Sequence, residues 1–175
     1  MRGRAEREAV ALLEELGIAS PAVNVEDIAT KLGIAVVRAK LEDNTSAMLI
    51  RKGSEALIML DEGQVRERQR FSIAHELGHF RLHQEPVFVD KSPMHISYRN
   101  TASSLAQEPR EIEANAFAAE LLMPGRWVCD EVERLRNSGR SLDEDELVME
   151  LKKTFKVSEP AIKFRLLNLG LISSF

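Results

Sequence analysis

The sequence lacks most features of secreted and membrane proteins. It has one cysteine, Cys129, so no disulfide bond can form within the chain. Its longest apolar runs, SAMLI (46–50) and ALIML (56–60), are too short to cross a bilayer, and the charged N-terminus has no apolar core of the signal-peptide type. We therefore expect a cytoplasmic protein that has no membrane partner.

The sequence also lacks an excess of positive charge. Lysine and arginine number 24 against 28 acidic residues, which gives a net charge of −4. Proteins that bind nucleic acid broadly need a basic surface, so direct nucleic-acid binding is not expected. The 44% hydrophobic and 30% charged residues are typical of a globular chain, and 175 residues are enough for one domain or for one with a small appendage.

The spacing of apolar residues predicts an α+β fold. Three short segments with strand character follow two helices, and the last two of them form a hairpin over 46–61. A long helix comes next, then an irregular stretch over 85–108 and further helices. We predict helices packed on a small sheet over 1–140, and a C-terminal, helix-turn-helix-like element over 141–175. The expected helices are 4–16, 25–32, 64–84, 110–123, 126–136, 143–154 and 159–168, and the expected strands are 34–41, 46–52 and 56–61.

The long helix contains the sequence His-Glu-Leu-Gly-His. His75 and His79 are four residues apart, so both imidazoles lie on one face and can bind one ion. Glu76 lies about 100° round the helix, where it can act as a general base on a water molecule. Gly78 lowers helix stability, so we expect a neighbouring segment or a substrate to approach the backbone there. His83 is too far along the axis to share the ion, and we expect it to end the helix.

A catalytic zinc ion usually has three protein ligands, so a third is expected elsewhere. The helix within PREIEANAFAAELLMP (109–124) offers Glu111, Glu113 and Glu120. Glu111 falls on the apolar stripe of that helix, whereas the other two fall on the opposite, solvent-facing side. Glu111 is therefore the preferred ligand, with Glu113 as the alternative and pairing of Glu111 with an arginine as the non-metal explanation. Asn115, one turn later, can orient a ligand histidine.

Three segments together resemble one known family. AHELGHFRLH (74–83), EIEANAFAAELLMP (111–124) and VSEPAIKFRLLNLGLI (157–172) are similar to segments of the ImmA/IrrE family of bacterial metallopeptidases. The second segment is the more specific, because His-Glu-x-x-His also occurs in many unrelated proteins.

The resemblance implies a zincin-like core and a zinc-dependent endopeptidase. It implies His75, His79 and Glu111 as metal ligands and Glu76 as general base. It also implies a helix-turn-helix transcriptional repressor as substrate, cleaved so that repression is relieved in a stress response or in the induction of a mobile element. The same ligands accept Mn²⁺ or Fe²⁺ in place of Zn²⁺.

Three further features are weaker candidates. Tyr98 and Arg99, followed by Asn100, lie between the two motifs and are the nearest candidates for stabilising an oxyanion, with ordinary loop residues as the alternative interpretation. An edge of the 46–61 hairpin could bind extended substrate by strand addition, on architectural analogy. Residues 141–175 carry six acids and five bases among their helices, which favours packing or partner recognition over DNA binding.

An alternative to the peptidase is a non-catalytic regulator. Such a protein would keep the metal-binding helix as structure and bind a repressor or antitoxin partner, or DNA, through its C-terminal helices. The sequence favours the enzyme, because a structural zinc site has no need of Glu76 and is usually rich in cysteine.

Overall fold

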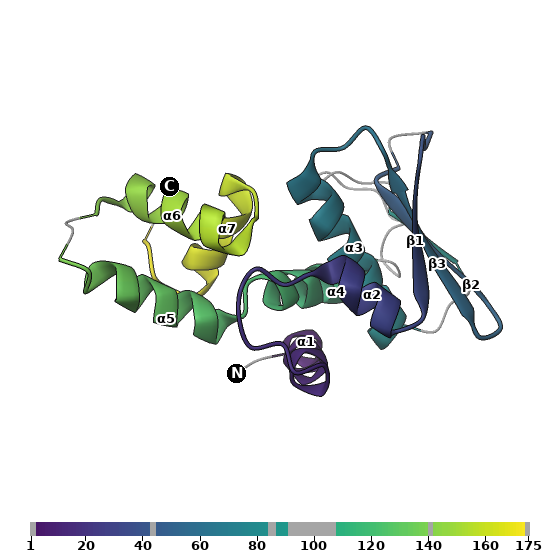
Figure 1. Cartoon of the computed structure of the whole chain (residues 1–175), viewed down its shortest axis with the longest axis horizontal. Helices are drawn as coiled ribbons and strands as arrows, with labels where there is room; N and C mark the ends of the chain where they lie inside the picture. The colour runs from purple at the N-terminus through teal and green to yellow at the C-terminus, as the bar shows by residue number, and fades with distance from the viewer. Residues whose placement is uncertain (1–2, 43–44, 84–86, 91–107, 140–141, 174–175) are drawn as a thin grey trace.

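The computed structural model describes residues 3–42, 45–83, 87–90, 108–139 and 142–173 (Figure 1). The predicted α+β class is confirmed, and the predicted helices and strands agree with the observed ones to within a few residues. The elements within the described residues are α1 (Arg4–Glu15), α2 (Val25–Lys31), β1 (Ile34–Ala39), β2 (Ala47–Lys52), β3 (Glu55–Asp61), α3 (Arg66–Leu82), β4 (Val87–Asp90), α4 (Glu108–Leu122), α5 (Gly125–Arg136), α6 (Glu144–Phe155) and α7 (Glu159–Asn168).

The sheet has four strands in the order β1-β3-β2-β4. The predicted hairpin is present, since β2 pairs with β3 in antiparallel register and Leu49 lies opposite Ile58. β1 pairs with the other side of β3 in parallel, and β4 pairs with the other side of β2. Both strands of the hairpin are thus paired on both sides. The prediction of a substrate-binding edge on the hairpin is therefore wrong, as is the prediction that 85–108 is irregular throughout.

Helix α3 lies between the sheet and helix α4. Its central residues are buried, and they pack on sheet side chains such as Leu49, Ile58 and Leu60, none of which is exposed to solvent. Helix α4 packs along the other side of α3, and α1 crosses α4. The N-terminal part therefore has three layers, and α3 is the middle one, as expected for a helix that is apolar on several faces.

The C-terminal helices α5, α6 and α7 form a helical group at the other end of the molecule from the sheet (Figure 1). Asp143 and Glu146 form a reciprocal capping box at the start of α6, and Ser158 caps α7. Arg165 of α7 is buried and forms an ion pair with Glu120 of α4. Glu120 is 2% exposed, so its prediction as a solvent-facing residue is wrong, because α7 covers that side of α4.

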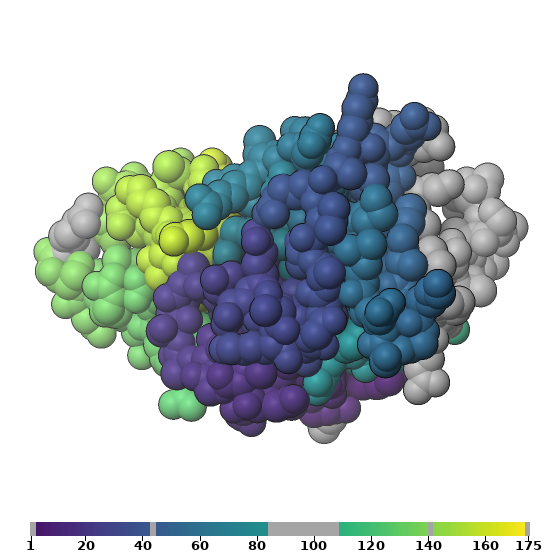
Figure 2. Space-filling view, turned by 45° about the vertical axis from the view of Figure 1, so that its right-hand side comes forward, coloured from purple at the N-terminus to yellow at the C-terminus, as the bar shows by residue number. Residues whose placement is uncertain are grey.

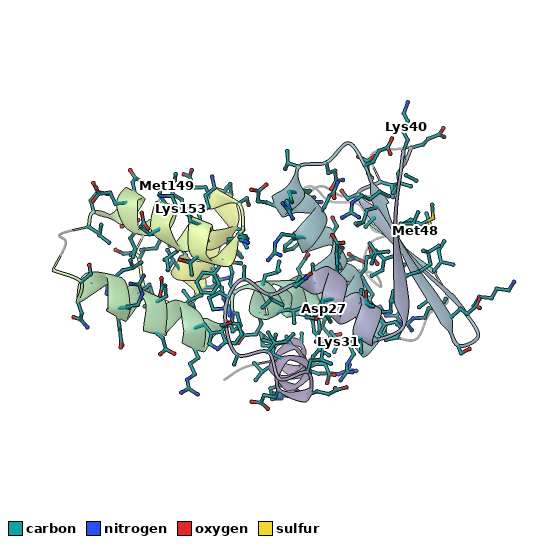
Figure 3. All side chains as sticks on the ribbon, viewed as in Figure 1. Asp27, Lys31, Lys40, Met48, Met149 and Lys153 are labelled. Carbon is teal, nitrogen blue, oxygen red and sulfur yellow. The ribbon has the colours of Figure 1, made fainter. Side chains whose placement is uncertain are left out.

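The large apolar side chains that are exposed include Val65 and Ile112. Figure 3 shows charged side chains around both ends of the molecule, including Lys40 after β1 and Lys153 on α6. In the space-filling view of Figure 2, the N-terminal segment lies between the C-terminal helices and the sheet. Among the helices that the structure describes, none combines the length and the apolarity needed to cross a membrane.

Candidate metal centre

Two histidines meet on the buried face of α3. Every residue from Ser72 to His79 is buried, with His75 3% and His79 1% exposed. Their rings are in edge-to-face contact with centroids 4.7 Å apart, and their Nε2 atoms are 3.0 Å apart. The spacing of four residues has this effect because successive turns of a helix superpose such side chains.

Glu111 of α4 completes the group. Its Oε2 atom lies 3.2 Å from Nε2 of His75, and its Oε1 atom lies 3.3 Å from Nε2 of His79. Two ligand atoms bound to one tetrahedral zinc ion are about 3.3 Å apart, as follows from bond lengths of about 2.0–2.1 Å. The three separations are close to that value, so these side chains suit a small divalent cation.

The protonation states also suit a cation. Burial alone would raise the pKa of Glu111, but hydrogen bonds from His75 and His79 outweigh burial and lower the pKa well below its usual value. The pKa of His79 is lowered, chiefly by burial and against the effect of its hydrogen bond to Glu111. A metal ion would take the place of the Nε2 protons that these hydrogen bonds share with Glu111, because the groups bind an ion as a carboxylate and neutral imidazoles.

The outer nitrogen of His75 is oriented from α4. Its Nδ1 atom lies 3.0 Å from Oδ1 of Asn115, one helical turn beyond Glu111. This is the contact that the sequence predicted for Asn115. An amide oxygen can only accept a hydrogen bond, so Asn115 keeps a proton on Nδ1 of His75 and leaves Nε2 as the atom that faces Glu111 and can bind an ion.

The outer nitrogen of His79 is oriented by a residue that the sequence did not assign to the site. Nδ1 of His79 lies 2.9 Å from Nδ1 of His83, whose Nε2 atom lies 3.1 Å from Oε2 of Glu113. His83 does end α3 as predicted, but it is buried and contacts His79. Glu113 pairs with His83 and is not the purely solvent-facing residue that was predicted. Glu111, and not Glu113, lies next to the histidine pair. The side chain of Glu111 is nevertheless 41% exposed, so the prediction that it points into the core is wrong.

Arg51 of β2 fixes the end of α3. Its guanidinium donates to the carbonyl oxygens of His79, Phe80 and His83 at 3.0, 2.6 and 2.7 Å, and it stacks on the Phe80 ring at 4.8 Å. A cation there satisfies the last carbonyls of the helix and complements its dipole. Sequence reasoning missed this residue, because nothing local links a strand arginine to a helix end.

Gly78 allows α3 and α4 to come together at the site. A Cβ atom at this position would lie 3.1 Å from Cα and 3.2 Å from O of Ala114, and 3.2 Å from Cβ of Phe117. The sequence predicted a close approach at Gly78, and the approaching segment is α4. The contact brings the start of α4, which carries Glu111, against the histidines of α3.

Of the other predicted site residues, one lies in the described part of the chain and three lie outside it. Glu76 lies between the two histidines in α3 and has no exposed surface. Tyr98, Arg99 and Asn100, the candidates for an oxyanion contact, lie outside the described residues.

The chain is similar to one family of known sequences and to a solved structure. The M78 peptidase model, described as an IrrE N-terminal-like domain, matches residues 29–167, which include both motifs. No curated protein sequence matches significantly. A solved Mycobacterium tuberculosis transcriptional regulator has a similar fold, with a TM-score of 0.61 and 18% identity over 93% of this chain. The match spans only 46% of that longer protein.

Proposed function

The chain belongs to the M78 peptidase family with its IrrE N-terminal-like domain, and from this premise we propose that it is a zinc-dependent endopeptidase. The observation that carries the proposal is the convergence of His75, His79 and Glu111, whose ligand atoms lie within 4.8 Å of one another. A purely structural pairing of Glu111 with His75 and His79 would not require Glu76 beside those histidines in α3. Zn²⁺ suits two imidazoles and a carboxylate, and Mn²⁺ or Fe²⁺ can take the same ligands.

The residues divide the chemical work between them. His75, His79 and Glu111 would hold the ion, which supplies a Lewis acid that polarises the scissile carbonyl and acidifies water. Glu76 takes the proton of the attacking water and delivers it to the leaving amine. Asn115 and His83 hold the two imidazoles in the orientation that the ligand role needs.

The proposed substrate is a helix-turn-helix transcriptional repressor, cleaved so that its target genes are released in a stress response or mobile-element induction. Two likenesses support this choice. The family resemblance implies such a substrate, and the solved protein of similar fold is itself a transcriptional regulator. At 18% identity the likeness to that regulator concerns the fold alone. The substrate class is therefore part of our proposal and goes beyond that likeness.

The architecture assigned to this function has two parts. Residues 1–140 would form a zincin-like core, and residues 141–175 a helix-turn-helix-like element that recognises the partner in the cytoplasm. Helices α6 and α7, joined by a short turn with Ser158 as the cap of α7, are compatible with this assignment. Their nearly balanced charge favours a protein partner over DNA.

Intact-mass spectrometry of a repressor encoded beside this chain tests the proposal. The repressor is incubated with the zinc-loaded protein, with the Glu76→Gln variant and with a chelator control. We expect two complementary fragments with the zinc-loaded protein alone, since Glu76→Gln keeps the metal ligands and removes the base. Metal analysis of the variant is the matched control.

Three outcomes separate the alternatives. Fragments that persist in chelator would contradict a metal-dependent reaction. Cleavage at the wild-type rate by Glu76→Gln would contradict the role of Glu76. An intact repressor that nevertheless co-purifies with the protein would favour the non-catalytic regulator, which binds its partner without cutting it.

A further inference from the structure

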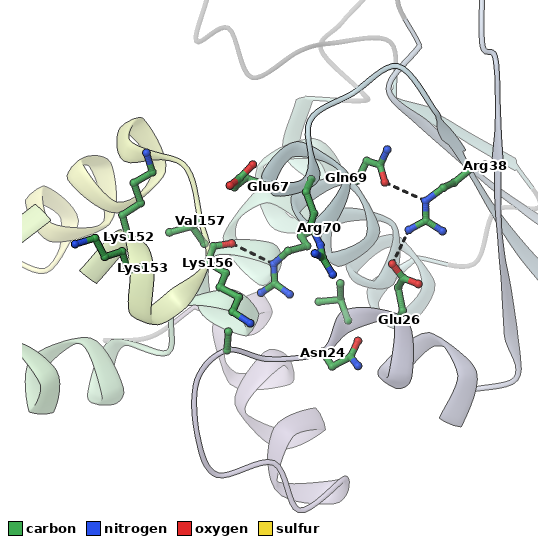
Figure 4. A pocket seen from close by; sticks show the side chains of 13 residues that line it. Asn24, Glu26, Arg38, Glu67, Gln69, Arg70, Lys152, Lys153, Lys156 and Val157 are labelled. Carbon is green, nitrogen blue, oxygen red and sulfur yellow. Dashed lines mark hydrogen bonds and ion pairs between the residues drawn. The ribbon is translucent and has the colours of Figure 1, made fainter. Parts of the chain in front are cut away.

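A cavity lies away from the histidines, between the N-terminal layers and the C-terminal helices. Its volume is about 810 Å³. Its walls come from the segment before α2, the end of β1, the first turns of α3 and the last turn of α6 (Figure 4). Neither motif of the metal centre contributes a side chain to it. Its basic lining residues are Arg38, Arg66, Arg70, Lys152, Lys153 and Lys156.

The cavity is positively charged in a chain that is negative overall. Six basic and two acidic side chains line it, whereas the whole chain carries a net charge of −4. One acid, Glu26, is already paired with Arg38 at 2.6 Å, and Lys153 is paired with Glu150 outside the cavity. Subtracting these pairs leaves four cations against Glu67. The cavity therefore has an excess of about three positive charges.

Among the described residues, no salt bridge joins an acid to any of the four remaining cations, although Glu67 and Glu26 attract Arg70 and Glu159 attracts Lys152. Neither Arg66, Lys152 nor Lys156 takes part in an ion pair there. Arg66 and Lys156 are exposed, and they stand on opposite walls, at the start of α3 and the end of α6. Since like charges repel, a cluster of this kind needs a reason to persist.

Arg70 lies at the centre of this cluster (Figure 4). Its guanidinium donates to the carbonyl oxygens of Val23 at 2.9 Å, Lys156 at 3.1 Å and Phe155 at 3.4 Å, all of them uncharged. The pKa of Arg70 is lowered, first by burial and then by repulsion from Arg66, against the attraction of Glu67 and Glu26. Arg70 thus joins three segments of the chain while its own charge is not neutralised by an ion pair.

We propose that this cavity binds a small anionic ligand that carries two or more phosphate groups, such as a nucleoside polyphosphate. Guanidinium forks and lysine ammonium groups are the side chains that bind phosphate oxygens best. A diphosphate carries about three negative charges, as each phosphate group contributes between one and two, and this matches the excess in the cavity. The volume lies within the range of small-molecule sites.

A small ligand fits better than nucleic acid. DNA binding requires a broad basic surface, whereas the basic side chains of this cluster line one concavity of a chain that is acidic overall. Val25 and Val157 also line the cavity and offer an apolar wall to an organic group attached to the phosphates.

The ligand would connect the C-terminal helices to the helix of the metal centre. Arg66 and Arg70 belong to the first turns of α3, and His75 follows in the same helix. Lys152 and Lys156 belong to the end of α6. A polyphosphate bound to both walls would hold these parts together and stabilise the folded chain. This binding is independent of whether the protein cleaves a peptide bond.

Isothermal titration calorimetry on the full-length, metal-loaded chain tests the proposal. The probes are inorganic triphosphate, ATP, inorganic monophosphate and a short DNA duplex, each at low and moderate salt. We expect saturable one-site binding of the triphosphate, with affinity that falls as salt rises and monophosphate weaker by about tenfold or more. Tighter binding of ATP than of triphosphate would identify a nucleotide, and equal binding a polyphosphate alone. Both results support the site.

A pair of double variants provides the matched control. Arg66→Gln/Lys156→Gln removes two exposed cations from opposite walls, and we expect the dissociation constant for triphosphate to rise about tenfold or more. Lys40→Gln/Lys52→Gln removes two exposed cations outside the cavity and should leave it unchanged. Triphosphate also chelates divalent ions. The heat from removal of the bound metal should be the same in both variants, so it is subtracted from the binding heat. Thermal unfolding checks that each variant is folded.

Three results would overturn the proposal. The first is the absence of saturable triphosphate binding at millimolar concentrations. The second is an equal loss of affinity in the two double variants, which would indicate attraction by overall charge. The third is tighter binding of the DNA duplex than of triphosphate, which would assign the basic cluster to nucleic acid.

Discussion

Nδ1 of His83 lies 2.9 Å from Nδ1 of His79, so the residue that ends α3 holds a proposed metal ligand one turn earlier. Only one of these two nitrogens can carry the shared proton. Glu113 lies 3.1 Å from Nε2 of His83, where a carboxylate accepts from an N–H group. Nδ1 of His83 is then the acceptor, Nδ1 of His79 carries the proton, and Nε2 of His79 is left as the ligand atom.

His83→Ala should weaken metal binding without removing a ligand. His79 would lose the group that fixes its ring and its tautomer, and the loss of such outer contacts typically costs about 10–100-fold in metal affinity. Competition with a chromophoric chelator measures the change. Glu113→Gln keeps a hydrogen-bonding group beside His83 without the charge, so its effect should be smaller. Wild-type affinity in a folded His83→Ala protein would show that His83 has no orienting role.

Asn115 makes the equivalent contact for His75, and two substitutions there should act in opposite directions. Asn115→Asp places a charge 3.0 Å from Nδ1 of His75, which makes that imidazole more basic and should tighten metal binding several-fold. Asn115→Ala removes the acceptor and should weaken binding by about tenfold. The same chelator competition measures both variants. Changes of the same sign would mean that Asn115 affects the site through packing and not through its oxygen.

Gly78→Ala should destabilise the fold although alanine favours helices. The gain in helix propensity is about 1 kcal/mol, but the new Cβ would contact the Ala114 backbone at 3.1 Å. Backbone cannot move aside as a side chain can, and overpacking of this kind costs about 1–3 kcal/mol. Urea unfolding measures the net loss. At Gly63 a Cβ would approach only a carboxylate of Asp61, at 3.4 Å, so Gly63→Ala should be nearly neutral. A stabilised Gly78→Ala protein would contradict the close contact.

The sequence predicted the parts of the site that depend on one helix at a time. The spacing of His75 and His79 fixes their common face, and the position of Glu111 on α4 distinguished it from Glu113 and Glu120 as the residue that meets them. These predictions succeed because helical periodicity is a local property. The pairing of Asn115 with His75 follows from the same geometry once the two helices are taken to meet.

Most of the wrong predictions concern contacts between segments distant in the chain. Glu120 was assigned to solvent because it lies opposite the apolar stripe of α4. That side of α4 is covered by α7, whose Arg165 pairs with Glu120. Glu113 was misassigned for the same reason, as His83 approaches it. The short strand β4, Val87–Asp90, was missed because four residues carry little periodicity, and its pairing with β2 closes the edge that the hairpin was expected to offer.

Acid should destabilise the metal-free protein in two steps. The pKa of His79 is lowered in the folded state by burial, so below its usual value of 6.5 the unfolded chain takes up a proton that folded His79 resists. The pKa of Glu111 is also lowered, because hydrogen bonds from the histidines outweigh burial. Its contribution is present above its usual value of 4.5 and is lost as the pH falls further.

The midpoint of urea unfolding, measured in chelator between about pH 7.5 and 4, follows this loss because two-state stability tracks proton uptake. We expect it to fall continuously as pH decreases. The His79→Gln/Glu111→Gln variant should lose less over the same range, since both titrating groups are gone while their size and polarity are kept. A wild-type midpoint that is constant, or that rises toward pH 5, would contradict the assigned protonation states. A bound divalent ion should steepen the decline, because protons then compete with the metal for the same atoms.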